Sequence, residues 1–286
     1  MHFGANTFIW RSPFTTQDTD LFDHIKEIGF DVVEIAVEDP KLIDPVIIHN
    51  ELKRTSLRGI VCGVFGVDRD ISSSDPTIRE AANQYLRWCI DFAQRIESPL
   101  ISGPMYACVG KARLLPPEER NVELQRSIKG IRRLCDYAIL KNVKLALEPL
   151  NRFENDMINT VSQGLDYIRE VDRPNLGLHL DTFHMHLEEK DSAEAILVAG
   201  KRLFHLHVCE NDRGVPGTGQ VHWLKIAAAL KEIHYDQAIV IESFTPEVKS
   251  IAQAVCIWRK IAPDQDTIAR QGLGFLQSLD LRSQGA

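Results

Sequence analysis

Four ionisable residues stand at comparable points of four apolar segments in the second half of the chain. They are Glu148 in "LALEP", Asp181 in "LHLDT", His207 in "LHVCEN" and Glu242 in "VIESF". Neighbouring members are separated by about 30 residues, the length of one strand-plus-helix unit. Because equal positions on successive strands of a closed barrel converge on its axis, we expect these four side chains to meet.

Three carboxylates and one imidazole form an oxygen-rich site for a divalent cation. Such a set suits Mn²⁺, Mg²⁺ or Co²⁺ better than Zn²⁺. Without a cation, the clustered carboxylates would repel one another and raise their own pKa values. One acid at a strand end is usually a helix cap or a solvated loop residue, but four in phase on consecutive strands favour a metal site.

The stretch "HLDTFHMHLEE" at 179–189 adds several further ionisable groups around Asp181. His179 lies two residues before Asp181, and His205 two residues before His207, so each shares a strand face with a proposed ligand about 6–7 Å away. We expect both to fill a polar layer inside the barrel or to orient a ligand. His186, Glu188 and Glu189 are expected to begin the next, solvated connection.

The rest of the chain supplies the elements that must position these residues. Short apolar or β-branched runs occur at 3–8, 32–37, 59–66, 99–104, 144–150, 176–182, 203–211 and 238–244. Helical spacing of apolar residues occurs at 20–28, 43–55, 77–96, 117–140, 161–171, 192–200, 222–233 and 247–261. This alternation predicts an α/β fold, a single (β/α)8 TIM barrel. The alternative, a doubly wound open sheet, lacks the usual Gly-rich loop after its first strand.

One domain is expected over residues 1–286, with an extra C-terminal helix at about 266–281, because no linker-like tract divides the chain. The hydrophobic content of 44% and charged content of 26% are ordinary for a globular protein. A net charge of −7 argues against a general nucleic-acid or anionic-membrane surface.

The expected location is the cytoplasm. The six cysteines form no CxxC pair, which indicates reduced thiols. The N-terminal "MHFGANTFIW" lacks a charged leader with a long apolar core. No apolar run approaches the roughly 20 residues that cross a bilayer.

The segments "EPLNRFE", "HLDTFHM", "HVCENDRGVPGTG" and "VIESF" resemble those of the ketose 3-epimerases, the family of D-tagatose 3-epimerase and D-psicose (D-allulose) 3-epimerase. The similarity extends to the opening "GANTFIW" and to "GVFG". The resemblance implies a xylose-isomerase-like barrel with one divalent metal ion, Mn²⁺ or Co²⁺ in most members, and assembly into a homodimer or homotetramer. We expect no organic cofactor.

The same resemblance assigns roles to residues of this chain. It implies Glu148, Asp181, His207 and Glu242 as metal ligands, and Glu154, His184 and Arg213 as residues that contact the ketose substrate.

Epimerisation at C3 explains why a metal ion and two acids would be needed together. The C–H bond beside a carbonyl is too weak an acid to lose its proton unaided, so an enediolate intermediate needs a metal ion at its oxygens. Two bases on opposite faces of C3 then exchange the proton, and Glu148 and Glu242 are the candidates.

Two further features concern the substrate. Phe8, Trp10, Phe65 and Phe244 lie at strand ends or in the following loops, where they could form an apolar rim or simply pack the barrel mouth. Arg213 could bind a phosphate, but phosphate sites usually supply several donors or a helix N-terminus. A non-phosphorylated sugar is therefore favoured.

Other functions remain open at this point. An aldose–ketose isomerase or a hydroxypyruvate isomerase would use a similar site to move hydrogen between C1 and C2. A DNA-repair endonuclease would need more histidines and a basic face. A catalytically silent sugar-binding protein would have lost a ligand or a base, and none is missing.

Overall fold

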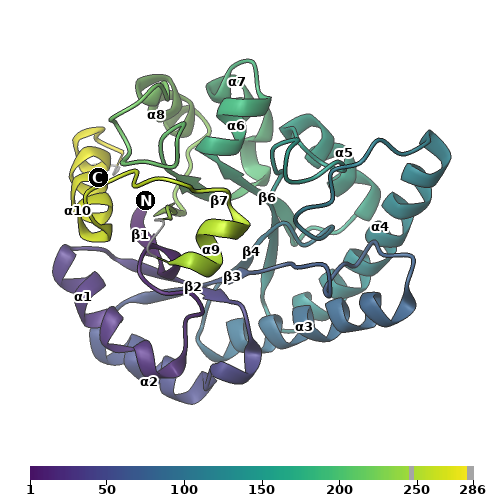
Figure 1. Ribbon diagram of the computed structural model, residues 1–286, viewed down its shortest axis with the longest axis horizontal. Helices are drawn as coiled ribbons and strands as arrows, with labels where there is room; N and C mark the ends of the chain where they lie inside the picture. The colour runs from purple at the N-terminus through teal and green to yellow at the C-terminus, as the bar shows by residue number, and fades with distance from the viewer. Residues whose placement is uncertain (245–247, 282–286) are drawn as a thin grey trace.

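Eight parallel strands close into a barrel in the computed structural model, which describes residues 1–244 and 248–281. The strands pair in sequence order and β1 closes against β8. They are β1 (His2–Asn6), β2 (Val32–Val37), β3 (Arg58–Gly63), β4 (Leu100–Gly103), β5 (Lys144–Leu147), β6 (Leu176–Asp181), β7 (Leu203–Val208) and β8 (Ala238–Ile241). Figure 1 shows them as a central ring surrounded by helices. The predicted (β/α)8 fold is confirmed.

The helices follow the strands in the order that the sequence predicts. They are α1 (Asp20–Ile28), α2 (Pro45–Thr55), α3 (Pro76–Arg95), α4 (Pro117–Ile139), α5 (Val161–Val171), α6 (Thr182–Glu188), α7 (Ser192–Ala199), α8 (Trp223–Glu232), α9 (Lys249–Ala254) and α10 (Gln265–Ser278). Helix α3 starts after the N-cap Asp75, whose side chain accepts from the Thr77 N–H, with Pro76 in the first turn. Of the described helices, none has the length and apolar character needed to cross a membrane.

Two connections differ from the sequence-based expectation. The helix expected over 247–261 covers only Lys249–Ala254 within the described residues. The segment after Asp181 is not a solvated connection but helix α6, because the Asp181 side chain caps it by accepting from the Phe183 N–H. His186 is exposed as expected, whereas Glu188 is largely buried in an ion pair with Arg152.

The barrel is buried on both faces of its sheet, so its strands read as nearly continuous apolar runs. Every residue of β2 and of β6 is buried. The acids and histidines inside these runs are therefore buried as well. The six cysteines are free thiols, of which only Cys256 is exposed.

A local irregularity sets the register of the two strands that carry Asp181 and His207. The pairing of β6 with β7 shifts between Leu178 and His179, after which His205 stands opposite His179 and His207 opposite Asp181. Before the shift, Phe204 covers Gly177, where an added Cβ would lie 2.4 Å from the ring. Irregularities of this kind re-aim side chains next to active sites.

Replacing Gly177 with alanine should therefore destabilise the barrel. The added methyl group would overlap the Phe204 ring, which typically costs about 1–3 kcal/mol of unfolding free energy. Urea unfolding measures the loss. Gly274→Ala is the matched control, because nothing lies within 4 Å of its added Cβ on α10, and it should stabilise by up to about 1 kcal/mol. Equal stability of the two variants would contradict the steric account.

Candidate active site and metal centre

The four proposed metal ligands come together at the carboxyl ends of strands β5 to β8. Glu148 directly follows β5, Asp181 ends β6, His207 lies near the end of β7, and Glu242 directly follows β8. One ligand atom from each lies within 4.8 Å of those of the others, and all four residues are buried. The strand ends thus gather residues far apart in sequence into one cluster.

The electrostatics of this cluster favour a cation. Burial raises the pKa of Glu148 well above its usual value, and repulsion by Glu242 adds to the shift. Burial also raises the pKa of Asp181, with a further contribution from Glu242, although Arg213 opposes it. The Nδ1 atom of His207 is buried without a hydrogen-bond partner among the described residues. Three crowded carboxylates and one unpartnered imidazole nitrogen fit a divalent metal ion.

Arg213 supplies positive charge beside the cluster. Its Nη1 atom lies 2.5 Å from Asp181 Oδ2 and 3.3 Å from Glu242 Oε2. The guanidinium also stacks over the Phe183 ring, with 4.1 Å to the ring centroid. Arg213 is buried, and its φ of 68° is positive. Its backbone N–H donates to the carbonyl of Glu210 in the same loop, which holds this conformation. The guanidinium therefore balances part of the negative charge of the site.

His184 places a second hydrogen-bond donor beside the ligand cluster, next to Arg213. Its Nδ1 atom accepts the backbone N–H of Asn151 at 3.1 Å. A backbone N–H can only donate, so the proton of the neutral imidazole is on Nε2. Burial, together with the charge of Arg213, lowers the pKa of His184 well below its usual value, which keeps the ring neutral. Its Nε2 lies 3.3 Å from Arg213 Nη2, so two donors converge at one point of the site. A substrate oxygen would satisfy both.

Glu154 lines the same cavity. Its Oε1 atom accepts from Asn151 Nδ2 at 2.8 Å, and burial raises its pKa. Asn151 thus positions both His184 and Glu154. The three residues predicted to contact substrate are brought together with the ligand cluster.

The cavity has a volume of about 360 Å³, within the range of small-molecule sites. Its polar end contains Glu148, Glu154, His184, Arg213 and Glu242. The remaining wall is mostly apolar and includes the predicted rim residues Phe8, Phe65 and Phe244 with Ile251 of α9, the helix that lies across the barrel mouth in Figure 1. Trp10 does not line this cavity, because its Nε1 donates to Asp266 at the start of α10.

A larger cavity of about 580 Å³ lies at the opposite end of the barrel, where His2, Arg58 and Gln237 are among its lining residues. It contains none of the proposed ligands. Active sites of (β/α)8 barrels lie at the carboxyl ends of the strands, so we place the chemistry in the smaller cavity.

Glu34 is a site residue that the sequence reasoning missed. It is fully buried on β2, and its carboxylate contacts Asn6, Ser102, His205 and His207. Burial raises the pKa of this carboxyl, but His207 and His205 together lower it well below its usual value. The signal was present in the sequence, because Glu34 is the single charged residue of the buried strand "VVEIAV".

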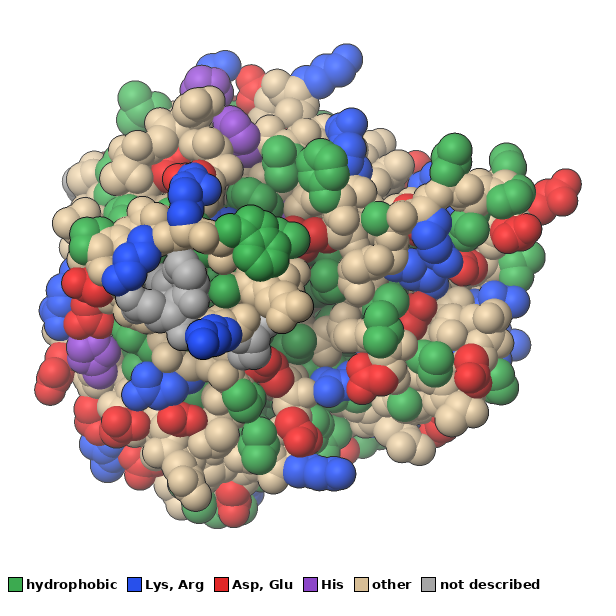
Figure 2. All heavy atoms as spheres, in the orientation of Figure 1, with side chains coloured by type: hydrophobic (Ala, Val, Ile, Leu, Met, Phe, Trp, Pro, Cys, Tyr) green, Lys and Arg blue, Asp and Glu red, His purple; other side chains and the backbone are tan. Residues whose placement is uncertain are grey.

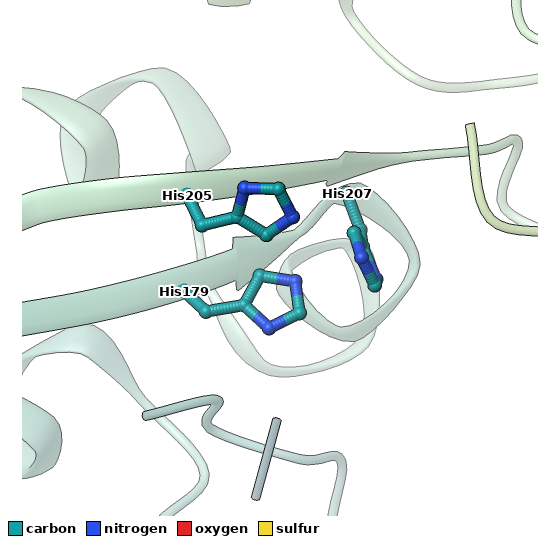
Figure 3. Close-up of side chains that lie close together, drawn as sticks. All are labelled: His179, His205 and His207. Carbon is teal, nitrogen blue, oxygen red and sulfur yellow. The ribbon is translucent and has the colours of Figure 1, made fainter. Parts of the chain in front are cut away.

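His179 and His205 form the polar layer expected beneath the ligands. Figure 3 shows their rings side by side in the barrel, with His207 nearer the strand ends. Both residues are fully buried, and His179 Nδ1 lies 3.6 Å from Glu148 Oε2. Ligand atoms of the three histidines also lie within 4.8 Å of one another. The geometry alone is therefore compatible with metal binding at this second cluster.

A buried lysine links the loops around the cavity through ion pairs. Lys111 Nζ lies 2.7 Å from Asp70 Oδ2 and 3.2 Å from Glu123 Oε2. The backbone on either side of Lys111 pairs with the loop of Glu154, through the N–H of Gly110 and the carbonyl of Lys111. This ion pair therefore ties the loops after β3, β4 and β5 to one another. No periodic pattern of residues indicates this ion pair.

Comparison with other proteins finds relatives whose sequences and structures match this chain along nearly its whole length. Residues 22–279 match the xylose isomerase-like TIM barrel family. A probable ketose 3-epimerase from Synechocystis sp. is 36% identical over 276 residues, which cover 96% of this chain and 95% of the relative. An L-ribulose 3-epimerase from Methylomonas sp. is 32% identical and covers 97% of both chains. The crystal structure of a Methylomonas sp. D-allulose 3-epimerase in complex with D-allulose superposes with a TM-score of 0.91 at 32% identity, covering 97% of this chain and 96% of that one.

The Asp70–Lys111 pair should make stability depend on pH. Burial opposes ionisation of Asp70, but hydrogen bonds from Lys111 and Ser72 outweigh it and lower its pKa. A carboxyl with a lowered folded-state pKa stabilises the protein above its unfolded-state pKa, and this contribution is lost as the pH falls through the folded-state pKa. Asp70→Asn should therefore cost about 1–3 kcal/mol of unfolding free energy at neutral pH.

Urea unfolding across the acid range measures this difference, which should shrink as the wild-type Asp70 becomes protonated. Asp166→Asn is the control, because its ion pair with Arg169 is exposed and should be worth less than about 1 kcal/mol. A difference between wild type and Asp70→Asn that stays constant into strong acid would contradict the assignment.

Proposed function

The chain belongs to the xylose isomerase-like TIM barrel family and, within it, to the ketose 3-epimerases, and we propose that it inverts C3 of free ketoses at a site holding one divalent metal ion. One observation carries the proposal. Two buried glutamates, Glu148 and Glu242, border a cavity in which a set of cation ligands and two convergent donors occur together.

The two glutamates would carry out the proton transfers at C3. One carboxylate removes the C3 proton, and the electrons of the C–H bond move into an enediolate across C2 and C3. The other glutamate, protonated at the start, returns a proton to the opposite face of C3, so the net composition is unchanged. The substrate's C3 configuration decides which glutamate acts first.

The remaining polar residues would hold the ketose. The convergent N–H groups of His184 and Arg213 would donate to its carbonyl-end oxygens, and Glu154 would accept a hydrogen bond from a hydroxyl group. A divalent ion bound by Glu148, Asp181, His207 and Glu242 would supply positive charge where the C2 oxygen becomes negative. We favour Mn²⁺, with Co²⁺ and Mg²⁺ as alternatives.

A free sugar is favoured over a sugar phosphate by the charges around the cavity. Arg213 is the one Lys or Arg side chain among its described lining residues, and it is already paired with Asp181. Glu148, Glu154 and Glu242 would repel a phosphate. The apolar wall would face the substrate's far carbons and offer few polar contacts there. We therefore propose substrates of the psicose/fructose, tagatose/sorbose or ribulose/xylulose type, in line with the names of the relatives.

The face drawn in Figure 2 shows basic and acidic side chains interspersed, without a continuous basic patch. This mixture disfavours the nucleic-acid alternative. Location in the cytoplasm and assembly into a dimer or tetramer stay predictions from the sequence.

Metal removal and restoration test the function directly. Protein treated with EDTA should lose turnover, and added Mn²⁺ should restore it on a panel of free ketoses that includes psicose, tagatose and ribulose. Chromatography should identify the products as other ketoses. Aldose products would instead indicate an aldose–ketose isomerase, and binding of the ketoses without any turnover would indicate a sugar-binding protein.

The two-glutamate mechanism predicts that Glu148→Gln and Glu242→Gln each lower turnover by about 10²–10⁴-fold, because an amide cannot exchange the C3 proton. Bound metal is quantified in each variant, so that loss of the ion is separated from loss of the base. Glu118→Gln, on the exposed surface of α4, should be unaffected. Full turnover in both active-site variants would rule the mechanism out.

A further inference from the structure

We infer that Glu34 is a positioning residue that fixes which nitrogen of His207 faces the metal ion. The inference rests on the proposed metal site and deepens it. Glu34 Oε2 lies 2.5 Å from His207 Nε2, and both side chains are fully buried. A carboxylate in this position accepts a hydrogen bond from Nε2–H, so the proton stays on Nε2 and the lone pair is on Nδ1.

The opposite nitrogen of the ring points to the metal cluster. His207 Nδ1 lies 3.3 Å from Glu242 Oε2 and has no hydrogen-bond partner among the described residues. If Nδ1 carried the proton instead, the ring would offer no lone pair to a cation bound beside Glu242. The contact with Glu34 therefore selects the tautomer that can act as a ligand.

The surroundings of Glu34 hold its carboxylate in the accepting orientation. Asn6 Nδ2 donates to Oε2 at 2.9 Å, and the Asn6 amide cannot turn over because its Oδ1 already accepts the Phe8 N–H. Ser102 Oγ contacts Oε1 at 2.6 Å, and His205 Nε2 lies 3.0 Å from the same oxygen. The His205 contact lacks hydrogen-bond geometry, so Oε1 accepts from Ser102, while Oε2 accepts from Asn6 and meets Nε2 of His207. Donors from β1, β4 and β7 fix a side chain that begins on β2.

This network also argues against a separate metal ion on His179, His205 and His207. The Nε2 atom of His207 points to Glu34 and would carry a proton there. Only Nδ1 of this ring is then free, and it faces Glu242 in the carboxylate-rich cluster, so His207 has no nitrogen left for a second ion. We therefore expect one metal ion per chain.

Glu34→Gln tests the inference, because it keeps the side-chain shape but removes the charge and adds an N–H that can donate to His207 Nε2. Metal-free proteins are titrated with Mn²⁺, and the free ion is followed by its electron paramagnetic resonance signal. Wild type should bind one Mn²⁺ per chain, and the variant should bind it about 10–100-fold more weakly. Asp70→Asn is the matched control, since it also neutralises a buried acid but has no contact with a proposed ligand, and its Mn²⁺ affinity should be unchanged.

The possible results distinguish the role of Glu34 from the existence of the metal site itself. Equal Mn²⁺ affinity of wild type and Glu34→Gln would overturn the role of Glu34, as would an equal loss in Asp70→Asn. Two Mn²⁺ ions per wild-type chain would overturn the single-site argument. No Mn²⁺ binding by wild type would instead refute the metal site on which the proposed function depends.

A measurement on the wild type keeps the inference testable if Glu34→Gln does not fold. In ¹⁵N-histidine-labelled protein loaded with Mg²⁺, two-bond ¹H–¹⁵N correlations show which ring nitrogen of His207 is protonated. Protonation at Nε2 is the expected result. A proton on Nδ1 would contradict the role assigned to Glu34.

Discussion

Repulsion among buried carboxylates is the constraint on which the organisation of the site depends. Glu148, Asp181 and Glu242 are all buried within one small cluster, where water screens their charges poorly. The protein surrounds them with positive or proton-donating groups. Arg213 pairs with Asp181 and Glu242, and His207 lies between Glu242 and Glu34. A divalent cation would complete this balance, which explains why acids are gathered where solvation is weakest.

The closed barrel fixes the positions of these charged side chains relative to one another. Parallel strands in sequential order bring their carboxyl ends to one rim, and the register shift between β6 and β7 sets Asp181 opposite His207. Beneath the rim, the histidines and Glu34 replace apolar side chains in the barrel interior. Within this layer Glu34 contacts the ligand His207 directly, whereas the ring nitrogens of His179 and His205 have no hydrogen-bond partner among the described residues.

Much of this arrangement could be predicted from the sequence because it follows from periodic patterns. The alternation of apolar runs and helical stretches gave the barrel, and the phase of Glu148, Asp181, His207 and Glu242 on successive strands gave their convergence. Features that depend on side-chain packing could not be found in this way. The contact of Glu34 with His207 joins β2 to β7, and Lys111 reaches Asp70 across two loops. Trp10 turns to Asp266 because α10 packs beside it, which no local pattern indicates.

The central claim is that one glutamate of this site removes the C3 proton of a ketose and the other returns a proton to the opposite face. The most direct measurement is turnover of a ketose by the Mn²⁺-loaded protein in D₂O, with the position of deuterium in the products determined by NMR. The account predicts deuterium at C3 of the epimerised ketose and none at C1. An epimer that retains its original hydrogen at C3, or a product labelled at C1, would contradict it.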